Sequence, residues 1–406
     1  MKTLYKKVSR QLERIDFEAL WPGFHPYPFA LYDSTYAVLD GRLISRPDNF
    51  RGNTTVVFEG RQIAIWNVSY DLPEDEEQFA SKLVHEMFHA FQMERKETRF
   101  PNDLLLAGTD LTPEYLALKA EEYRCLTRPG GLPRFRALRE RRRALNPGCI
   151  REELLAETAE GMAQYIELCA LGQLAGDSGR TGGENRAADG RRAENRAADR
   201  RRDEDKAADR RRDEDKAADG QRAKDKAAGG RRDGERLQAA LAECASRLAD
   251  PGLLPDSRRC AYDSGSLLLF AARREGLTLF HDIGGESRSV YDILLPQIPQ
   301  ADCPVSLDGE MLAPWARVLS DRTAQREQLI RAFLQEAHTT VNGCFRICGY
   351  DPMNLWREGN RLYSTSFLAL AEETGNIITL TGRALLQMLP GSPDTVLAYS
   401  TAIPDT

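Results

Sequence analysis

The sequence predicts an α+β fold that is mainly helical, with a small antiparallel sheet near its start and a β region at its end. Two observations carry this prediction. Short β-branched and aromatic runs, separated by Gly, Asn and Pro, fill residues 27–71, and an alternating pattern returns near the C-terminus. Between them, apolar residues recur with the 3.6-residue period of amphipathic helices. With 406 residues, of which 41% are hydrophobic, the chain can form two or three domains with a real core.

Each predicted element follows from its local pattern. The runs FALYD, YAVLD, TTVVFEG and RQIAIWNVSY predict the N-terminal strands. A helix is expected over residues 72–97, with Asp71 as N-cap and Pro73 in the first turn. RLYSTSFLALA and NIITLTG, separated by the turn-prone EETGN, predict a C-terminal hairpin. Further helices are predicted at 112–127, 132–145, 149–173, 236–248, 262–275, 291–295 and 314–338.

A repetitive charged segment interrupts the helical part. From Glu184 to Asp233 a ten-residue unit recurs five times, and no Val, Ile, Leu, Met, Cys or aromatic residue occurs between Leu174 and Leu237. Such a segment cannot bury enough apolar area to offset its ordering entropy, so we expect it to be disordered or to form a solvated charged helix. It is interpreted as a tolerated linker, with a docking arm for an acidic or protein partner as the alternative.

The charge distribution does not favour nucleic acid as a partner. The repeats hold 17 basic and 14 acidic residues, and the other 356 residues carry a net charge of -9. Acidic neighbours neutralise most of the field that counterion release needs.

Cysteine usage and hydropathy point to the cytoplasm. Eight scattered cysteines without a CxxC pair indicate reduced thiols, and Cys344 and Cys348 are interpreted as buried thiols. No apolar run approaches the roughly 18 residues that a membrane-spanning helix needs, and charges stand where a secretory signal has its apolar centre. We therefore expect a cytoplasmic protein without a membrane partner.

The candidate chemistry lies on the first long helix, in the HExxH sequence that runs from His85 to His89. Two histidines four residues apart project about 40° from each other on a helical wheel and can chelate one metal ion. Both fall outside the apolar arc, so we expect them to face a cleft. Glu86 is then placed to accept a proton from metal-bound water. A pair of surface or hydrogen-bonded histidines is the alternative.

A third ligand is predicted at Glu160, on the polar side of the helix ELLAETAEGMAQYIELCALG. Gly161 follows it in the helix interior, where glycine costs roughly 1 kcal/mol relative to alanine; close approach of a second helix or a bound group would explain it. The alternatives are Glu157, which could instead orient a ligating imidazole, and Glu121 or Glu122.

HEMFHAFQ, followed 70 residues after His89 by AEGMAQY, resembles the gluzincin zinc metallopeptidases, in which a glutamate on a later helix completes the HExxH site. The resemblance covers roughly residues 55–171, with a looser echo in YDSGSLLLF. It implies a zincin-like core in which His85, His89 and Glu160 bind Zn²⁺. Glu86 would then be the general base in the hydrolysis of a peptide or protein substrate. The spacing before Glu160 is longer than in the thermolysin-like and aminopeptidase branches, and the endo- or exo-preference stays open.

Less specific signals concern substrate binding. Tyr262 is the first candidate for the oxyanion donor and His281 the second, with a packed or capping role as the alternative for both. Trp66 and Asn67 could belong to a sheet edge that binds an extended substrate, although a core role is the expected one for Trp66.

The predicted organisation has five parts. These are an N-terminal β-rich part of the catalytic domain (1–71), the helical catalytic core (72–175), the charged insertion (176–236), a helical C-terminal part of the catalytic domain (237–340) and a small β-rich segment (341–406). The second functional hypothesis is a catalytically inactive, zinc-stabilised scaffold that captures its partner through the insertion or the C-terminal segment.

Overall fold

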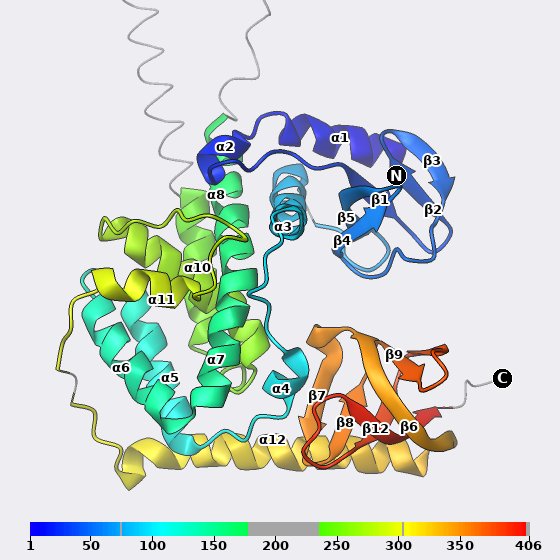
Figure 1. Cartoon of the computed structure of the whole chain (residues 1–406). Helices are drawn as coiled ribbons and strands as arrows, with labels where there is room; N and C mark the ends of the chain where they lie inside the picture. The colour runs from blue at the N-terminus through cyan, green and yellow to red at the C-terminus, as the bar shows by residue number, and fades with distance from the viewer. Residues whose placement is uncertain (74, 178–234, 303, 403–406) are drawn as a thin grey trace, which may run out of the picture. The chain divides into compact units, whose positions relative to one another are not determined.

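The computed structural model describes residues 1–73, 75–177, 235–302 and 304–402 (Figure 1). The predicted charged insertion lies almost wholly outside the described residues. The fold divides into two compact units: unit 1 holds residues 1–90 and 166–240, and unit 2 holds 91–165 and 241–406. Helices and sheets occur in both, which agrees with the α+β class. No helix in the described ranges combines the length and apolarity needed to cross a bilayer.

Unit 1 contains a five-stranded sheet in the order β3-β2-β1-β5-β4. Most neighbours are antiparallel, as predicted, but β1 and β5 pair in parallel, so the sheet is mixed. Its core includes Tyr32, Phe50 and Ile65. The elements are α1 (Lys2–Leu12), α2 (Phe17–Leu20), β1 (Phe29–Tyr32), β2 (Tyr36–Leu39), β3 (Arg42–Ser45), β4 (Thr54–Phe58) and β5 (Arg61–Asn67).

The sheet-edge position considered for Trp66 and Asn67 is wrong, whereas the core role expected for Trp66 is confirmed. Both lie on β5, which pairs with β1 on one side and with β4 on the other. Trp66 is 4% exposed, and its indole N–H donates to the carbonyl of Asp71 at 2.7 Å. Its ring lies 5.5 Å from that of Phe79. Trp66 is therefore a core residue.

Helix α3 (Glu76–Glu94) carries the HExxH sequence and starts later than predicted. Asp75, not Asp71, caps it, because the Asp75 carboxylate accepts the amide N–H of Gln78 at 2.6 Å. The predicted apolar face is confirmed: Leu83 and Phe88, among others, are fully buried. Unit 1 also contains most of α8 (Met162–Asp177) and the beginning of a helix over 235–248.

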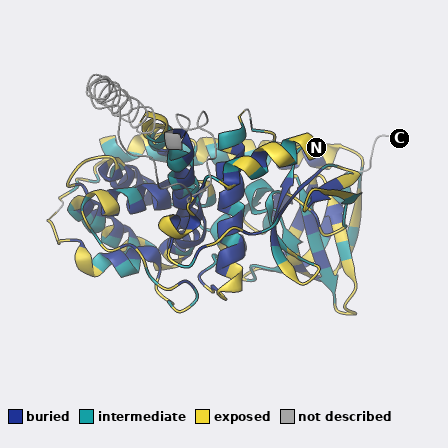
Figure 2. Cartoon of the chain, turned by 90° about the horizontal axis from the view of Figure 1, so that it is seen from above, coloured by how far each residue is buried: buried dark blue, intermediate teal, exposed yellow. Residues whose placement is uncertain are grey.

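In unit 2, helices α5, α6, α7 and α10 pack side by side (Figure 1). Side-chain caps at Thr112, Asn146 and Asp256 begin α5, α7 and α10. Buried and exposed positions alternate along many of the helices, as amphipathic packing requires (Figure 2). The helical elements are α4 (Asp103–Ala107), α5 (Pro113–Leu126), α6 (Leu132–Leu145), α7 (Pro147–Ala156), η1 (Glu157–Gly161), α10 (Ser257–Arg274), α11 (Val290–Leu294), η2 (Leu295–Gln297) and α12 (Gly309–Gln335).

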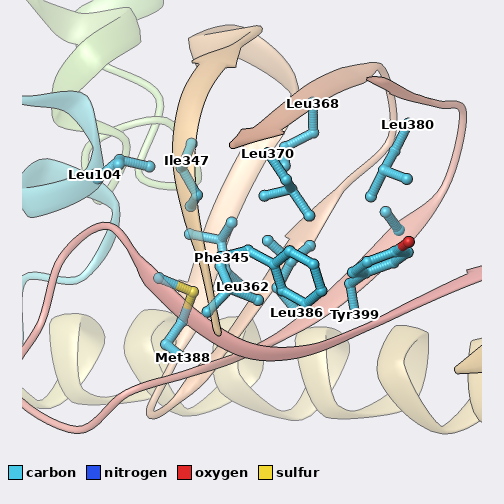
Figure 3. Close-up of a cluster of buried hydrophobic side chains, with 12 residues drawn as sticks. Leu104, Phe345, Ile347, Leu362, Leu368, Leu370, Leu380, Leu386, Met388 and Tyr399 are labelled. Atoms are coloured by element: carbon cyan, nitrogen blue, oxygen red, sulfur yellow. The ribbon is translucent and has the colours of Figure 1, made fainter. Parts of the chain in front are cut away.

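Unit 2 ends in a seven-stranded antiparallel sheet in the order β10-β9-β6-β12-β11-β8-β7. One face buries an apolar cluster that Leu104 of α4 joins (Figure 3). On the other side, Ile330 and Phe333 of α12 pack with Tyr363 and Leu385. The elements are β6 (His338–Tyr350), η3 (Pro352–Asn354), β7 (Leu355–Glu358), β8 (Arg361–Ser364), β9 (Phe367–Glu372), β10 (Ile377–Thr381), β11 (Ala384–Met388) and β12 (Thr395–Ala402).

Three expectations for this region can be compared with the sheet. The hairpin across EETGN is confirmed as β9 and β10, although RLYSTSFLALA forms two strands, β8 and β9. The helix predicted to reach His338 ends at Gln335, and His338 begins β6. Cys344 and Cys348 are exposed free thiols, not buried ones, because β6 turns the alternate residues Phe345 and Ile347 into the core.

Candidate metal centre

The two histidines of the HExxH sequence lie on adjacent turns of α3. Their Nε2 atoms are 3.2 Å apart, and their rings meet edge to face with centroids 4.9 Å apart. His89 and Glu86 are half-buried, whereas His85 is only 6% exposed. His85 thus exposes little surface, and the expectation that both histidines face a cleft stays a prediction.

The buried His85 contacts a carboxylate on α8. The Nδ1 atom of His85 lies 3.1 Å from Oε2 of Glu167. This contact favours a proton on Nδ1, which leaves the lone pair of Nε2 directed to a metal ion. The sequence interpretation missed Glu167, although a signal was present: a residue seven positions after Glu160 lies on nearly the same face of a helix.

Glu160 lies in η1, a π-helical turn between α7 and α8. Such turns insert one extra residue into a helix and are frequent at functional sites. Thr158 fixes the turn: its hydroxyl donates to the carbonyl of Leu154 at 2.7 Å and accepts the amide N–H of Val290 at 3.0 Å. Glu160 itself is 6% exposed.

Close approach of a second helix explains the glycine after Glu160, as predicted. A Cβ atom built on Gly161 would lie 2.5 Å from the Cα of Gly265 and 3.0 Å from the carbonyl oxygen of Ala261, both on α10. Gly265 is equally constrained, since its Cβ would lie 2.7 Å from the carbonyl oxygen of Glu157. The paired glycines let the backbone of the ligand-bearing turn touch α10.

Substitution of Gly161 by alanine is expected to destabilise the protein by about 1–3 kcal/mol, because backbone atoms must shift to admit the methyl group. The same shift moves Glu160, so metal affinity should fall as well. Gly172→Ala is the matched control on the same long helix, because its Cβ would meet only Leu237 at 3.7 Å. That variant should be neutral or about 0.5–1 kcal/mol more stable. Chemical unfolding and metal titration measure both effects, and equal behaviour of the two variants would contradict the packing argument.

Gln92 links the last turns of α3 to the residue before Glu160. Its side chain is fully buried, and its amide N–H donates to the carbonyl of Ala159 at 3.3 Å. This contact lies one turn beyond His89 on the metal helix. Gln92 therefore helps to position the backbone that carries Glu160.

His85, His89 and Glu160 form a group that could hold a metal ion: each offers one ligand atom, and these atoms all lie within 4.8 Å of one another. Tetrahedral zinc, with bonds of about 2.0–2.2 Å, needs ligand atoms roughly 3.3 Å apart, a separation that the two imidazoles already have. Two imidazoles and a carboxylate suit Zn²⁺ and other first-row transition metals. The residues present therefore fit a metal with three protein ligands.

Arg258 of α10 binds the predicted carboxylate ligand. Its Nη2 donates to Oε1 of Glu160 at 2.5 Å. Its Nη1 forms an ion pair with Asp103, 3.1 Å from Oδ1, but the geometry does not make a hydrogen bond. Burial opposes the charge of Arg258, yet Glu160, Tyr262 and Asp103 together hold its pKa above the usual value. Burial raises the pKa of Asp103 to about 6, against the opposing charge of Arg258.

The alternative glutamates have other partners. Glu157, the residue expected to orient an imidazole, accepts two hydrogen bonds from Arg139, at 2.5 and 2.7 Å, and one from Ser264. Glu122 also binds Arg139. Glu121 pairs with arginines at the end of α5 and on α6. The carboxylate that contacts a histidine of the pair is Glu167 instead.

The two oxyanion candidates lie in different surroundings. Tyr262 is half-buried on α10, one turn beyond Arg258, whose pKa its charge affects. His281 donates from Nδ1 to the carbonyl of Leu279 at 3.1 Å and accepts from Arg99 at 3.2 Å. Burial lowers the pKa of His281. These contacts tie His281 to Arg99, whereas Tyr262 lies beside the arginine that holds Glu160.

Glu167→Gln tests the role of the carboxylate behind His85. We expect metal affinity to fall about 10–100-fold, because a neutral amide is a weaker acceptor for Nδ1–H and no longer raises the basicity of the imidazole. Competition with a chelator of known affinity measures the loss. Glu94→Gln, at the exposed end of α3, is the control and should keep full affinity. Unchanged affinity in Glu167→Gln would show that this contact does not support the site.

Comparisons with known proteins add no family: no family model matches the chain, and no significant match was found among the curated proteins or the solved structures.

Proposed function

We propose that this protein is a zinc-dependent hydrolase, namely a metallopeptidase of the gluzincin type with a zincin-like core, that acts on a peptide or protein substrate in the cytoplasm. One observation carries the proposal: His85, His89 and Glu160, from separate helical segments, offer ligand atoms within 4.8 Å of one another. The contact of His85 with Glu167 supports it, because histidines that bind catalytic metals usually donate their second nitrogen to such a partner.

The remaining residues have roles that follow from their places. A bound zinc ion would lower the pKa of a water molecule towards about 7 and polarise the scissile carbonyl. Glu86 follows His85 directly and is half-buried, so its carboxylate can accept the proton of that water and return it to the leaving amine. Arg258 orients the carboxylate of Glu160 by a hydrogen bond. Tyr262 is the proposed donor to the oxyanion.

The test combines metal analysis with a substrate screen. Purified protein should contain close to one zinc ion per chain and should cleave members of a peptide library. A chelator should abolish cleavage, and added zinc should restore it. Protein that binds no divalent metal with useful affinity would refute the metal site, whereas cleavage that survives complete metal removal would refute the mechanism.

A zinc-stabilised scaffold without catalysis is the second candidate. The burial of His85 and Glu160, each 6% exposed, favours it, because structural metal sites are closed to solvent. It predicts tightly bound zinc, a large loss of stability on chelation and no cleavage of any library peptide. Hydrolysis that depends on zinc would exclude this candidate.

A further inference from the structure

Unit 2 contains a second candidate binding site, in a cavity of about 470 Å³. Its walls are α4 and the loop after it, one side of α12, and the turns after β7 and β11. Three arginines and two acidic residues line it: Arg322 and Arg326 on α12, Arg357 and Glu358 on β7, and Asp110 in the loop after α4. The volume is that of a typical small-molecule site.

Two of these arginines are held in place by backbone carbonyls. Arg357 donates to the carbonyls of Gly359 at 2.8 Å and Ser392 at 3.2 Å. Arg326 donates to the carbonyl of Arg357 at 2.9 Å and forms an ion pair with Glu358 at 3.3 Å. Gly108 leaves room for this arrangement, because a Cβ there would lie 3.1 Å from the Cδ of Arg357. The cavity wall is therefore built around fixed guanidinium groups.

Arg322 has no hydrogen bond or ion pair within the described part of the chain. It lies one helical turn before Arg326, and both belong to the wall of the same cavity. Burial and the neighbouring charge of Arg326 lower the pKa of Arg322 to about 10, while the charges of Asp256 and Glu358 act in the opposite direction. A half-buried cation next to another cation is unfavourable for folding, so a ligand that neutralises it would offset this cost.

The charges define the kind of ligand. Glu358 neutralises Arg326, whereas Arg322 and Arg357 have no carboxylate partner among the described residues. The lining thus carries a net charge of +1, which favours an anion, and guanidinium groups donate charge-assisted hydrogen bonds to phosphate oxygens. Leu104, Leu111 and Leu319 form an apolar part of the wall that can contact the rest of such a molecule.

We propose that this cavity binds a small phosphate monoester, whose phosphate group contacts Arg322 and Arg357, with Arg326 beside them. The nucleoside phosphates and the sugar phosphates share this chemistry. The proposal is independent of the metal centre, because all residues that line the cavity lie on other segments of unit 2.

Calorimetric titration of the full chain with inorganic phosphate, at constant ionic strength, tests the site. We expect saturable binding to the wild-type protein and at least ten-fold weaker binding to Arg322→Gln and to Arg357→Gln. Arg317→Gln is the matched control, because Arg317 lies on the same helix, is 84% exposed and pairs with Asp321. This variant should bind phosphate as the wild type does.

The stability of the variants separates a binding role from a structural one. Without phosphate, Arg322→Gln should unfold at the same or a higher temperature than the wild type, because the substitution removes an unpaired, partly desolvated cation. Parallel titrations with a nucleoside monophosphate and a sugar phosphate identify the source, since the preferred class should bind more tightly than inorganic phosphate. Absence of saturable phosphate binding, or binding that both variants retain, would overturn the proposal.

Discussion

Replacement of Glu86 by glutamine is expected to leave the metal bound and to slow peptide hydrolysis by about 10²–10⁴-fold. The physical reason is that the amide keeps the size and most of the hydrogen bonds of the carboxylate but cannot accept a proton. Glu86 is not a member of the metal-binding group, so metal content should not change. The turnover rate of a library-derived peptide, together with metal analysis of the same sample, measures the effect.

Two controls make this result specific. His89→Ala removes a member of the metal-binding group and should lose both metal and activity, whereas Glu94→Gln on the exposed end of α3 should lose neither. Full activity in Glu86→Gln would end the general-base proposal while leaving the metal centre intact. Loss of zinc in Glu86→Gln would instead mean that this carboxylate helps to hold the ion.

The metal-binding group could be predicted because its spacing is local. The i, i+4 placement of His85 and His89 depends only on the helical period, and Glu160 was recognisable from its side of the helix and from Gly161. The glycine also predicted a close approach, which Gly265 of α10 provides.

The side chains that support the group could not be predicted as easily. Arg258 contacts Glu160 from a helix almost a hundred residues later in the chain, and no local sequence pattern predicts that contact. Glu167 lies on nearly the same helix face as Glu160, but nothing in the local sequence shows that it contacts His85, which lies 82 residues earlier in the chain.

The sheets show the same limit. Strand β5 was placed correctly, but whether it lies at an edge depends on β1 and β4, which flank it. Strand β6 was not predicted, because Gly343 and Gly349 weaken its strand pattern and its partners β9 and β12 come much later in the chain. The local hydrophobic period thus predicts whether a segment is a helix or a strand better than it predicts which elements lie beside that segment.

Substitution of Glu153 by glutamine is expected to lower the free energy of unfolding by about 3–5 kcal/mol at neutral pH, which is the cost of leaving buried charges without a partner. Glu153 lies on α7 and is 3% exposed. Lys119 donates to its carboxylate at 2.9 Å, and Arg142 and Ser257 also bind it. Both cations are fully buried, so the variant leaves them with too little negative charge nearby.

The same substitution should change how stability depends on pH. Burial alone would raise the pKa of Glu153, but Arg142 and Lys119 outweigh it and hold that pKa far below the usual value of 4.5. Because the folded state favours the ionised form, its contribution is complete above about pH 4.5 and is lost as the pH falls below that value. Asp103, whose pKa is raised to about 6, instead favours the folded state at acidic pH, and it does so in the wild type and in Glu153→Gln alike. The difference between wild type and Glu153→Gln isolates Glu153.

Unfolding by denaturant from neutral to acidic pH measures that difference, which should be largest at neutral pH and should shrink below about pH 4.5. Glu243→Gln is the control, since Glu243 is 71% exposed in its ion pair with Arg247 and should contribute at most about 1 kcal/mol. A second variant, Glu153→Gln combined with Lys119→Met, removes one of the stranded cations and should recover part of the loss. A stability difference that does not vary with pH would mean that the ionised carboxylate of Glu153 is not what stabilises this helical core.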